Sequence, residues 1–140
     1  MRELHTSLET VAALTPRTIA TDTTTAGSIV DRQGFEAVEF VIAAGTLTDG
    51  AYAVLIEEGD AANLSDAAAV ADADLIGTEA DIAYALTEDN EVHKIGYKGS
   101  KRYVRLSLVS TSTSSGGVLG AVALLGRPYR SATVAAADPA

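Results

Sequence analysis

Five of the ten lysine and arginine residues of this chain lie between Lys94 and Arg105, in a molecule whose net charge is −9. The same stretch contains Tyr97 and Tyr103. Tyr and Arg are enriched at the hot spots of protein interfaces, and a local positive field steers association with an acidic surface. The chemistry that this stretch predicts is recognition of a protein, on an acidic partner or on the acidic residues 57–81 of the chain itself. A solvated strand face is the alternative interpretation of such a charge run.

The residues that could support catalysis or hold a metal ion are poorly arranged. His5 and His93 are the two histidines, and neither belongs to a recognisable arrangement of nucleophile, base and orienting acid. The absence of cysteine removes thiolate chemistry and cysteine metal sites. Eight acidic residues lie between positions 57 and 81, but Asp72-Ala73-Asp74 lacks the spacing of a calcium-binding loop. We therefore expect no enzyme activity, no cofactor and no metal site.

Residues 96–101 contain Gly, Lys and Ser, as phosphate-binding loops do, but without the spacing and the strand-to-helix context of such loops. A β-corner in which Gly99 turns the backbone is the better prediction. The net charge and a pI near 4.5 argue against a nucleic-acid partner. The N-terminal residues lack the apolar region of a signal peptide, and no segment has the roughly 20 apolar residues of a membrane span. We expect a soluble protein that is made in the cytoplasm and has no membrane partner.

The elements that must position the basic stretch are short strands, separated by turn signals, from Ile29 onward. This pattern predicts an all-β sandwich or barrel. Three strands alternate so that one face is apolar, with the sets Val38, Phe40 and Ile42; Tyr52, Val54 and Ile56; and Val104, Leu106 and Leu108. Asp49-Gly50 predicts a hairpin between the first two of these strands. Tyr103, Arg105, Ser107 and Val109 are predicted to point outward from the third.

Three weaker patterns complete the predicted elements. Val118 to Leu125 is aliphatic on both faces, which predicts a strand that is central in its sheet or covered by a partner. Leu75 to Thr78 is predicted to be a short edge strand. Asn63 or Ser65 could cap a short helix over residues 67–71.

The two ends of the chain are predicted to be extensions of the sandwich. Leu4, Leu8 and Val11 have helical spacing, but Pro16 and the many threonines of residues 1–26 favour an extended arm. The alanine-rich residues 129–140 are predicted to be a loose tail or to lie over a neighbour. The predicted organisation is an N-terminal arm (1–26), a β-sandwich domain (27–128) and a C-terminal tail (129–140).

Several motifs in their order along the chain resemble a family of tailed-phage proteins. They are Thr23–Asp31, Gly34–Phe40, Gly45–Gly50, Asp74–Thr78, Ile95–Arg105 and Leu124–Pro128. Together they are similar to the capsid cement (decoration) proteins, among them a jelly-roll cement protein of a Bordetella phage. The resemblance covers residues 20–128.

The resemblance implies a jelly-roll-like β-sandwich with an extended N-terminal arm and no cofactor. It implies a structural virion protein that binds the outer surface of an icosahedral capsid and stabilises contacts between capsomers. The implied partners are the major capsid protein and a second copy; a homodimer is favoured, and a homotrimer is the alternative. The implied location is the capsid exterior, after assembly in the host cytoplasm.

The basic stretch and the arm supply the predicted contacts with the capsid or with a second copy. The predicted contact residues are Tyr97, Lys98, Lys101, Arg102, Tyr103, Arg105, Thr15, Arg17 and Thr18. A head-tail joining or tail protein is the alternative within virions. A carbohydrate-binding jelly roll is the alternative from another class, although the absence of Trp leaves sugars without their most common stacking platform.

Overall fold

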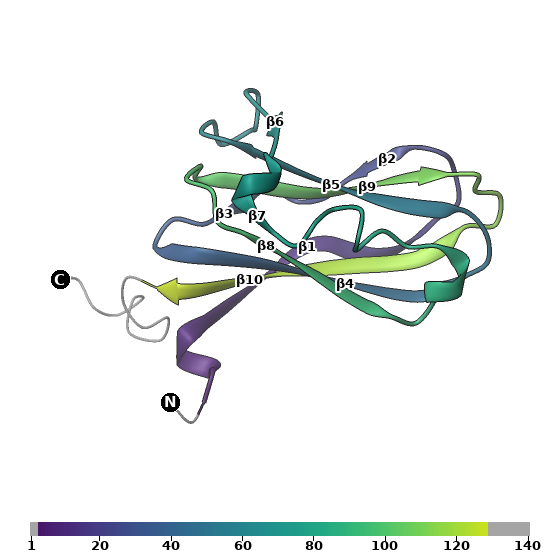
Figure 1. The fold of residues 1–140 in the computed structure, drawn as a ribbon, viewed down its shortest axis with the longest axis horizontal. Helices are drawn as coiled ribbons and strands as arrows, with labels where there is room; N and C mark the ends of the chain where they lie inside the picture. The colour runs from purple at the N-terminus through teal and green to yellow at the C-terminus, as the bar shows by residue number, and fades with distance from the viewer. Residues whose placement is uncertain (1–2, 129–140) are drawn as a thin grey trace.

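Two antiparallel β-sheets pack face to face and form a sandwich, as the sequence predicts (Figure 1). The computed structural model describes residues 3–128 of the chain. We name the sheets A and B. Sheet A has the strand order β1-β10-β4-β8-β7, and sheet B has the order β2-β9-β5-β6, with β3 also pairing with β9.

The bounds of the elements follow the chain. The strands of sheet A are β1 (Leu8–Ile19), β4 (Phe35–Leu47), β7 (Leu75–Ile76), β8 (Val92–Tyr97) and β10 (Gly117–Pro128). The strands of sheet B are β2 (Thr24–Ala26), β3 (Val30–Asp31), β5 (Ala51–Gly59), β6 (Ala68–Ala69) and β9 (Tyr103–Thr111). The short 3₁₀ helices are η1 (His5–Ser7), η2 (Asp72–Asp74) and η3 (Leu86–Glu88). Within residues 3–128, none of the helices is long and apolar enough to cross a membrane.

The order of the strands is that of a jelly roll. The first strand pairs with the last (β1 with β10), and the pairs β2–β9, β4–β8 and β5–β6 follow inward along the chain. This nested pairing is a long antiparallel ribbon, and folding the ribbon over itself creates the contacts β10–β4 and β9–β5. Two sheets built in this way form a jelly roll. The predicted all-β, jelly-roll-like sandwich is therefore confirmed.

The core lies between the sheets and comes from the three alternating patterns found in the sequence. All nine side chains of those patterns are buried, namely Val38, Phe40, Ile42, Tyr52, Val54, Ile56, Val104, Leu106 and Leu108. β10 lies between β1 and β4, which confirms its predicted central position. β7 confirms the predicted edge strand at Leu75 and Ile76.

The predicted hairpin between residues 36–44 and 51–58 is wrong. β4 pairs with β10 and β8 in sheet A, whereas β5 pairs with β9 and β6 in sheet B. Gly50 has the predicted positive φ of 89°, but the turn carries the chain from one sheet to the other. Alternation shows that each strand has a buried face, and in a sandwich both sheets offer such a face. The chain also changes sheets between β8 and β9, so the two strands that flank the basic loop do not pair with each other.

The predicted N-terminal arm is wrong for residues 8–19. β1 pairs with β10 from Leu8↔Gly126 to Ile19↔Gly117, and its Leu14 is 1% exposed. Pro16 is tolerated because it lies at a register shift on an edge strand, where no ladder hydrogen bond is lost. The sandwich therefore begins at β1 and not at residue 27.

Two further predictions concern the acidic region and the tail. The predicted helix over residues 67–71 is wrong, because Ala68 and Ala69 form β6 and pair with Glu58 and Glu57. The predicted tail, residues 129–140, lies outside the described residues.

Candidate interaction surfaces

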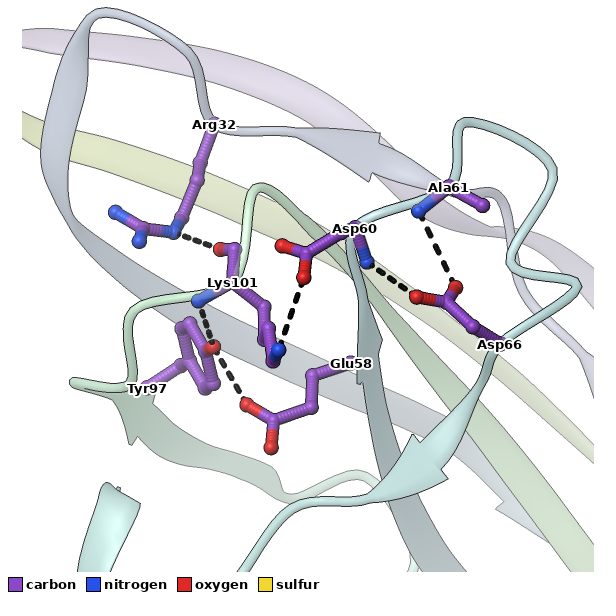
Figure 2. Close-up of polar contacts among 7 residues, drawn as sticks. All are labelled: Arg32, Glu58, Asp60, Ala61, Asp66, Tyr97 and Lys101. Carbon is purple, nitrogen blue, oxygen red and sulfur yellow. Dashed lines mark hydrogen bonds and ion pairs between the residues drawn. The ribbon is translucent and has the colours of Figure 1, made fainter.

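Three loops meet at one end of the sandwich, and one of them contains the predicted contact residues Lys98, Lys101 and Arg102 (Figure 2). They are residues 32–34 before β4, residues 60–67 after β5 and residues 98–102 between β8 and β9. Arg32 Nε donates a hydrogen bond to the carbonyl oxygen of Lys101, and Lys101 Nζ lies 2.9 Å from Asp60 Oδ2. The Asp66 carboxylate accepts from the amides of Asp60 (2.8 Å) and Ala61 (3.2 Å). We call this region the loop corner.

Tyr97 is at the centre of the loop corner and does not belong to its surface. Its side chain is 2% exposed, and its hydroxyl donates to Glu58 Oε1 at 2.7 Å and accepts from the Lys101 amide at 3.0 Å. Burial, and then the hydrogen bond to Glu58, raises the pKa of Tyr97 well above that of a free phenol. The predicted role of Tyr97 as a contact residue is wrong, because the strand alternation of β8 points this side chain into the core.

Gly99 has a different role from the predicted one. It is not among the described glycines with positive φ. A Cβ at this position would lie 2.5 Å from Tyr97 Oη, so the close approach of the phenol requires glycine here. The loop is shaped by packing on Tyr97.

Three cations of the basic stretch, Lys101, Arg102 and Arg105, are paired with carboxylates of the same chain. Arg102 binds Asp31 through two hydrogen bonds of 2.9 and 2.8 Å. The hydrogen bond from Arg102 lowers the pKa of Asp31, and the same bond raises the pKa of Arg102. Arg105 Nη2 lies 2.8 Å from Glu57 Oε1, on the outer face of sheet B. The predicted attraction between the basic stretch and the acidic residues is therefore satisfied inside one molecule for Lys101 and Arg105.

The other predicted contact residues occupy two separate places. Lys98 is exposed, and Tyr103 is half-buried with the Arg102 guanidinium 5.0 Å from its ring centroid. Thr15, Arg17 and Thr18 are exposed along β1, where Arg17 Nη2 donates to Thr15 Oγ1 at 2.7 Å.

The structure does not bring these two groups together. Tyr97 is level with Val38 and Leu125, whereas Thr18 is level with Val118. Seven residues of an extended strand span about 23 Å. The β1 residues therefore lie at the opposite end of sheet A from the loop corner.

The outer face of sheet A is a second candidate surface. Four of the six large hydrophobic side chains that are exposed in the described residues point outward from this sheet, namely Ile76, Val92, Val118 and Val122. They belong to rows of cross-strand neighbours that are apolar almost throughout, such as Ala12–Val122–Val41 and Gly120–Ala43–Val92. The signal for this face was present in the sequence, as the two apolar sides of Val118 to Leu125.

Two charged side chains point outward from the central strands β10, β4 and β8 of this face. They are Glu39 and Lys94, and neither forms an ion pair within the described residues. Glu39 lies over Gly96, where a Cβ would come within 2.9 Å of Glu39 Oε1. Burial raises the pKa of Glu39, and the nearby charge of Lys94 acts in the opposite direction. The Glu39 carboxylate is therefore partly buried and forms no ion pair with a basic side chain of the described residues.

A third group joins η3 to β8. His93 Nε2 lies 3.3 Å from Glu91 Oε1 and 3.5 Å from Glu88 Oε2, and His93 Nδ1 lies 2.9 Å from the carbonyl oxygen of Ile82. The imidazole stacks on Tyr84 with 4.1 Å between ring centroids. In the described residues this is the group whose side chains come close enough to share a metal ion. The two carboxylates are equally suited to contact the His93 imidazole directly. The arrangement therefore serves as a contact that joins η3 to β8.

The comparisons with known proteins give distant structural similarities. No protein-family model matches the chain, and no curated protein matches it in sequence. The chain is similar to the SPBc2 prophage-derived protein YomS, with 11% identity over 86% of this chain and 93% of that chain and a TM-score of 0.40.

Two further solved structures show similarities of the same order. A chain of the disulfide-linked pili of Bacillus endospore appendages has 10% identity over 84% of both chains and a TM-score of 0.44. A chain of the infectious bursal disease virus Gx strain has 12% identity over 89% of this chain and 34% of that chain, with a TM-score of 0.45. Similarity at this level leaves the function to be argued from the surfaces of the molecule.

Proposed function

We propose that this chain is a structural virion protein that binds the outer surface of an icosahedral phage capsid and stabilises contacts between capsomers. The observation that carries the proposal is the apolar outer face of sheet A. Soluble monomers rarely expose a large continuous apolar patch, and such patches mark interfaces with other proteins. The motifs shared with capsid cement proteins supply the kind of assembly in which this interface would serve.

The architecture supports a mechanical role. A jelly roll closed by ladders from β1 to β10 is a rigid body, because each strand of sheet A between its edges is held on two sides. A rigid body that binds two neighbouring capsomers resists their separation, since parting them requires the loss of one of its interfaces. The exposed residues among the predicted contacts lie far enough apart to touch different subunits, with Lys98 and Arg102 at one end of the sandwich and Thr15, Arg17 and Thr18 at the other.

The proposal is tested by counting this protein in purified virions and locating it. Quantitative mass spectrometry should find many copies per particle, and cryo-EM of the same particles should place jelly-roll density over the joints between capsomers. A small number of copies at one vertex would instead identify a head-tail joining or tail protein. Specific binding on a glycan array, without density on the shell, would favour a carbohydrate-binding module. Either result would contradict the proposal.

The predicted contacts are tested by a charge reversal at Lys98. This lysine forms no ion pair in the described residues, so Lys98→Glu leaves the internal pairs of the loop corner intact. If Lys98 touches the capsid, occupancy on expanded shells falls in co-sedimentation while the thermal unfolding midpoint is unchanged. Leu86→Asp, at an exposed position in η3, is the control for a surface change elsewhere. Equal occupancy of wild type and Lys98→Glu would remove this residue from the contact.

A further inference from the structure

We propose that Glu88, Glu91 and His93 bind one divalent transition-metal ion of the Zn²⁺ class. Imidazole nitrogen and carboxylate oxygen atoms are ligands that Zn²⁺ takes in proteins. The three ligand atoms lie within 4.8 Å of one another. No metal site was expected from the sequence, because the fold brings these groups together. The inference goes beyond the proposed function and does not depend on it.

The orientation of the His93 ring leaves one nitrogen ready to bind a cation. Nδ1 lies 2.9 Å from the carbonyl oxygen of Ile82. A carbonyl oxygen can only accept a hydrogen bond, so Nδ1 carries the hydrogen and a neutral ring has its lone pair on Nε2. Metal-binding histidines are oriented in this way, by a hydrogen bond from their other ring nitrogen. Nε2 is the nitrogen that faces the two carboxylates.

The distances between the ligand atoms leave room for an ion. Nε2 lies 3.3 Å from Glu91 Oε1 and 3.5 Å from Glu88 Oε2. A charge-assisted N–H···O bond is about 2.7–2.9 Å long, so both distances exceed that of a tight direct bond. Ligands placed tetrahedrally at about 2.1 Å from Zn²⁺ lie about 3.4 Å from one another. Both carboxylates therefore stand at the spacing that an ion on Nε2 requires, and the direct contact is the metal-free form of the site.

The imidazole is held rigidly, whereas the carboxylates are accessible. The His93 side chain is 15% exposed and stacks on the buried Tyr84. The Tyr84 hydroxyl donates to the carbonyl oxygens of Ile42 (2.9 Å) and Glu91 (3.0 Å), which fixes the backbone of one carboxylate ligand. The side chains of Glu88 and Glu91 are 32% and 53% exposed. An ion can therefore enter from solvent, and the glutamates can rotate to close around it.

The site lies on the inner side of β8 and not on the outer face of sheet A. His93 alternates with Val92 and Lys94, which point outward. Tyr84 also exchanges two backbone hydrogen bonds with Tyr52 of sheet B, of 2.9 and 2.8 Å. The segment from Tyr84 to His93 thus connects the two sheets, and a bound ion would fasten this connection. The outer face of sheet A remains free for a partner.

Zinc binding is tested with the full-length protein without a histidine tag. Isothermal titration calorimetry with ZnCl₂ should show one saturable site, and the thermal unfolding midpoint should rise with Zn²⁺ and return after EDTA is added. His93→Gln should abolish this site. His5→Gln is the matched control, because His5 is exposed and does not belong to the group. Excess Ca²⁺ should not displace Zn²⁺, since Ca²⁺ requires six to eight oxygen ligands.

The carboxylates are tested by removing one charge at a time. Loss of an outer partner of a metal ligand costs about 10–100-fold in affinity, and loss of a ligand in Glu88→Gln or Glu91→Gln should cost at least as much. Asp89→Asn removes the same charge from the same turn and should bind Zn²⁺ as wild type does. In NMR spectra of the two imidazole rings, Zn²⁺ should shift the resonances of His93 and leave those of His5 unchanged.

The inference is overturned if the wild type shows no saturable zinc site, which would leave the group as a direct contact only. It is also overturned if His93→Gln binds Zn²⁺ as wild type does, because the ion would then lie on other surface carboxylates. Circular dichroism of each variant shows whether it is folded, and the NMR measurement on wild type decides the matter even if His93→Gln is not. None of these measurements involves virions, so this inference and the proposed function are refuted separately.

Discussion

Tyr97 belongs to a stretch whose composition is typical of an exposed contact surface, but its side chain makes its contacts inside the molecule. The stretch around it is basic and aromatic, but its phenol joins two loops through Glu58 and the Lys101 amide. The contact also explains Gly99, which leaves room for the ring. The buried Tyr97 side chain therefore fixes the loop that carries the basic residues beside it.

Replacement of Tyr97 by Phe should destabilise the fold. The change leaves the Glu58 carboxylate and the Lys101 amide without their partner, which costs about 1–3 kcal/mol of unfolding free energy. Tyr103→Phe is the control, because the Tyr103 hydroxyl makes no hydrogen bond within residues 3–128 and its loss should cost close to nothing. Urea unfolding followed by circular dichroism at one fixed protein concentration measures both. Equal midpoints for the two variants would show that the Tyr97 hydroxyl is not a structural link.

Among the strands, β1 is the one that differs most from the predicted organisation, because it is part of sheet A and not an arm. Its pairing with β10 turns β10 from an edge into a central strand and thereby widens the outer face of sheet A. Leu14 and Ile19 add the inward side chains that fasten it to the core.

Leu14→Ala tests this role. A strand that buries Leu14 loses about 2–5 kcal/mol of unfolding free energy on this truncation, whereas a mobile arm would lose nothing. Leu4→Ala is the matched control, since Leu4 is 66% exposed. Thermal and urea unfolding of the two variants should separate clearly. An unchanged unfolding midpoint for Leu14→Ala would instead support the predicted N-terminal arm.

Asp49 joins the loop between β4 and β5 to the loop between β9 and β10, at the end opposite the loop corner. Its carboxylate accepts hydrogen bonds from the amides of Ser114 (2.9 Å), Ser115 (2.9 Å) and Gly116 (2.8 Å). These bonds, with that of Ser115 the largest, lower the pKa of Asp49 below its usual range. Hydrogen bonds to the charged form have this effect because they stabilise the carboxylate relative to the acid.

The stability of the protein should depend on pH through this group. A carboxyl whose folded pKa is lowered stabilises the fold above its unfolded pKa of about 3.9, and this contribution is lost as the pH falls through the folded pKa. Asp49→Asn should lower the unfolding midpoint at pH 7 and reduce its decline on acidification. Asp72→Asn changes the net charge equally and serves as control, because Asp72 is exposed and its side chain makes no hydrogen bond or ion pair within residues 3–128. Parallel pH curves for wild type and Asp49→Asn would contradict the assignment.

At the scale of the whole molecule, charge and apolar surface are segregated. Most acidic residues of the described chain lie in the loops and in sheet B, while the outer face of β10, β4 and β8 carries one acidic residue, Glu39, and one basic residue, Lys94. The charge keeps separate molecules apart, and the outer face of sheet A is where a partner can approach.

The sequence by itself determined the class of fold and the composition of its core. Alternation in strands such as Val104 to Leu108 follows from the pleat of a single strand, so it can be read without knowing the neighbours. The turn at Gly50 is likewise a local property of the backbone. The apolar outer side of β10 was also visible in the sequence, because Val118 to Leu125 is aliphatic on both faces.

The tertiary structure alone decided which strands pair and which charges are free. β4 and β5, and β8 and β9, separate into different sheets because each pattern fits either layer of the sandwich. Arg102 meets Asp31 across 71 residues, and Tyr97 meets Glu58 across 39, so no local pattern records these contacts. The outer face of sheet A exists only once β1, β10, β4 and β8 lie side by side. The physical reason is that the packing of the whole core sets the register between strands that are distant in the sequence.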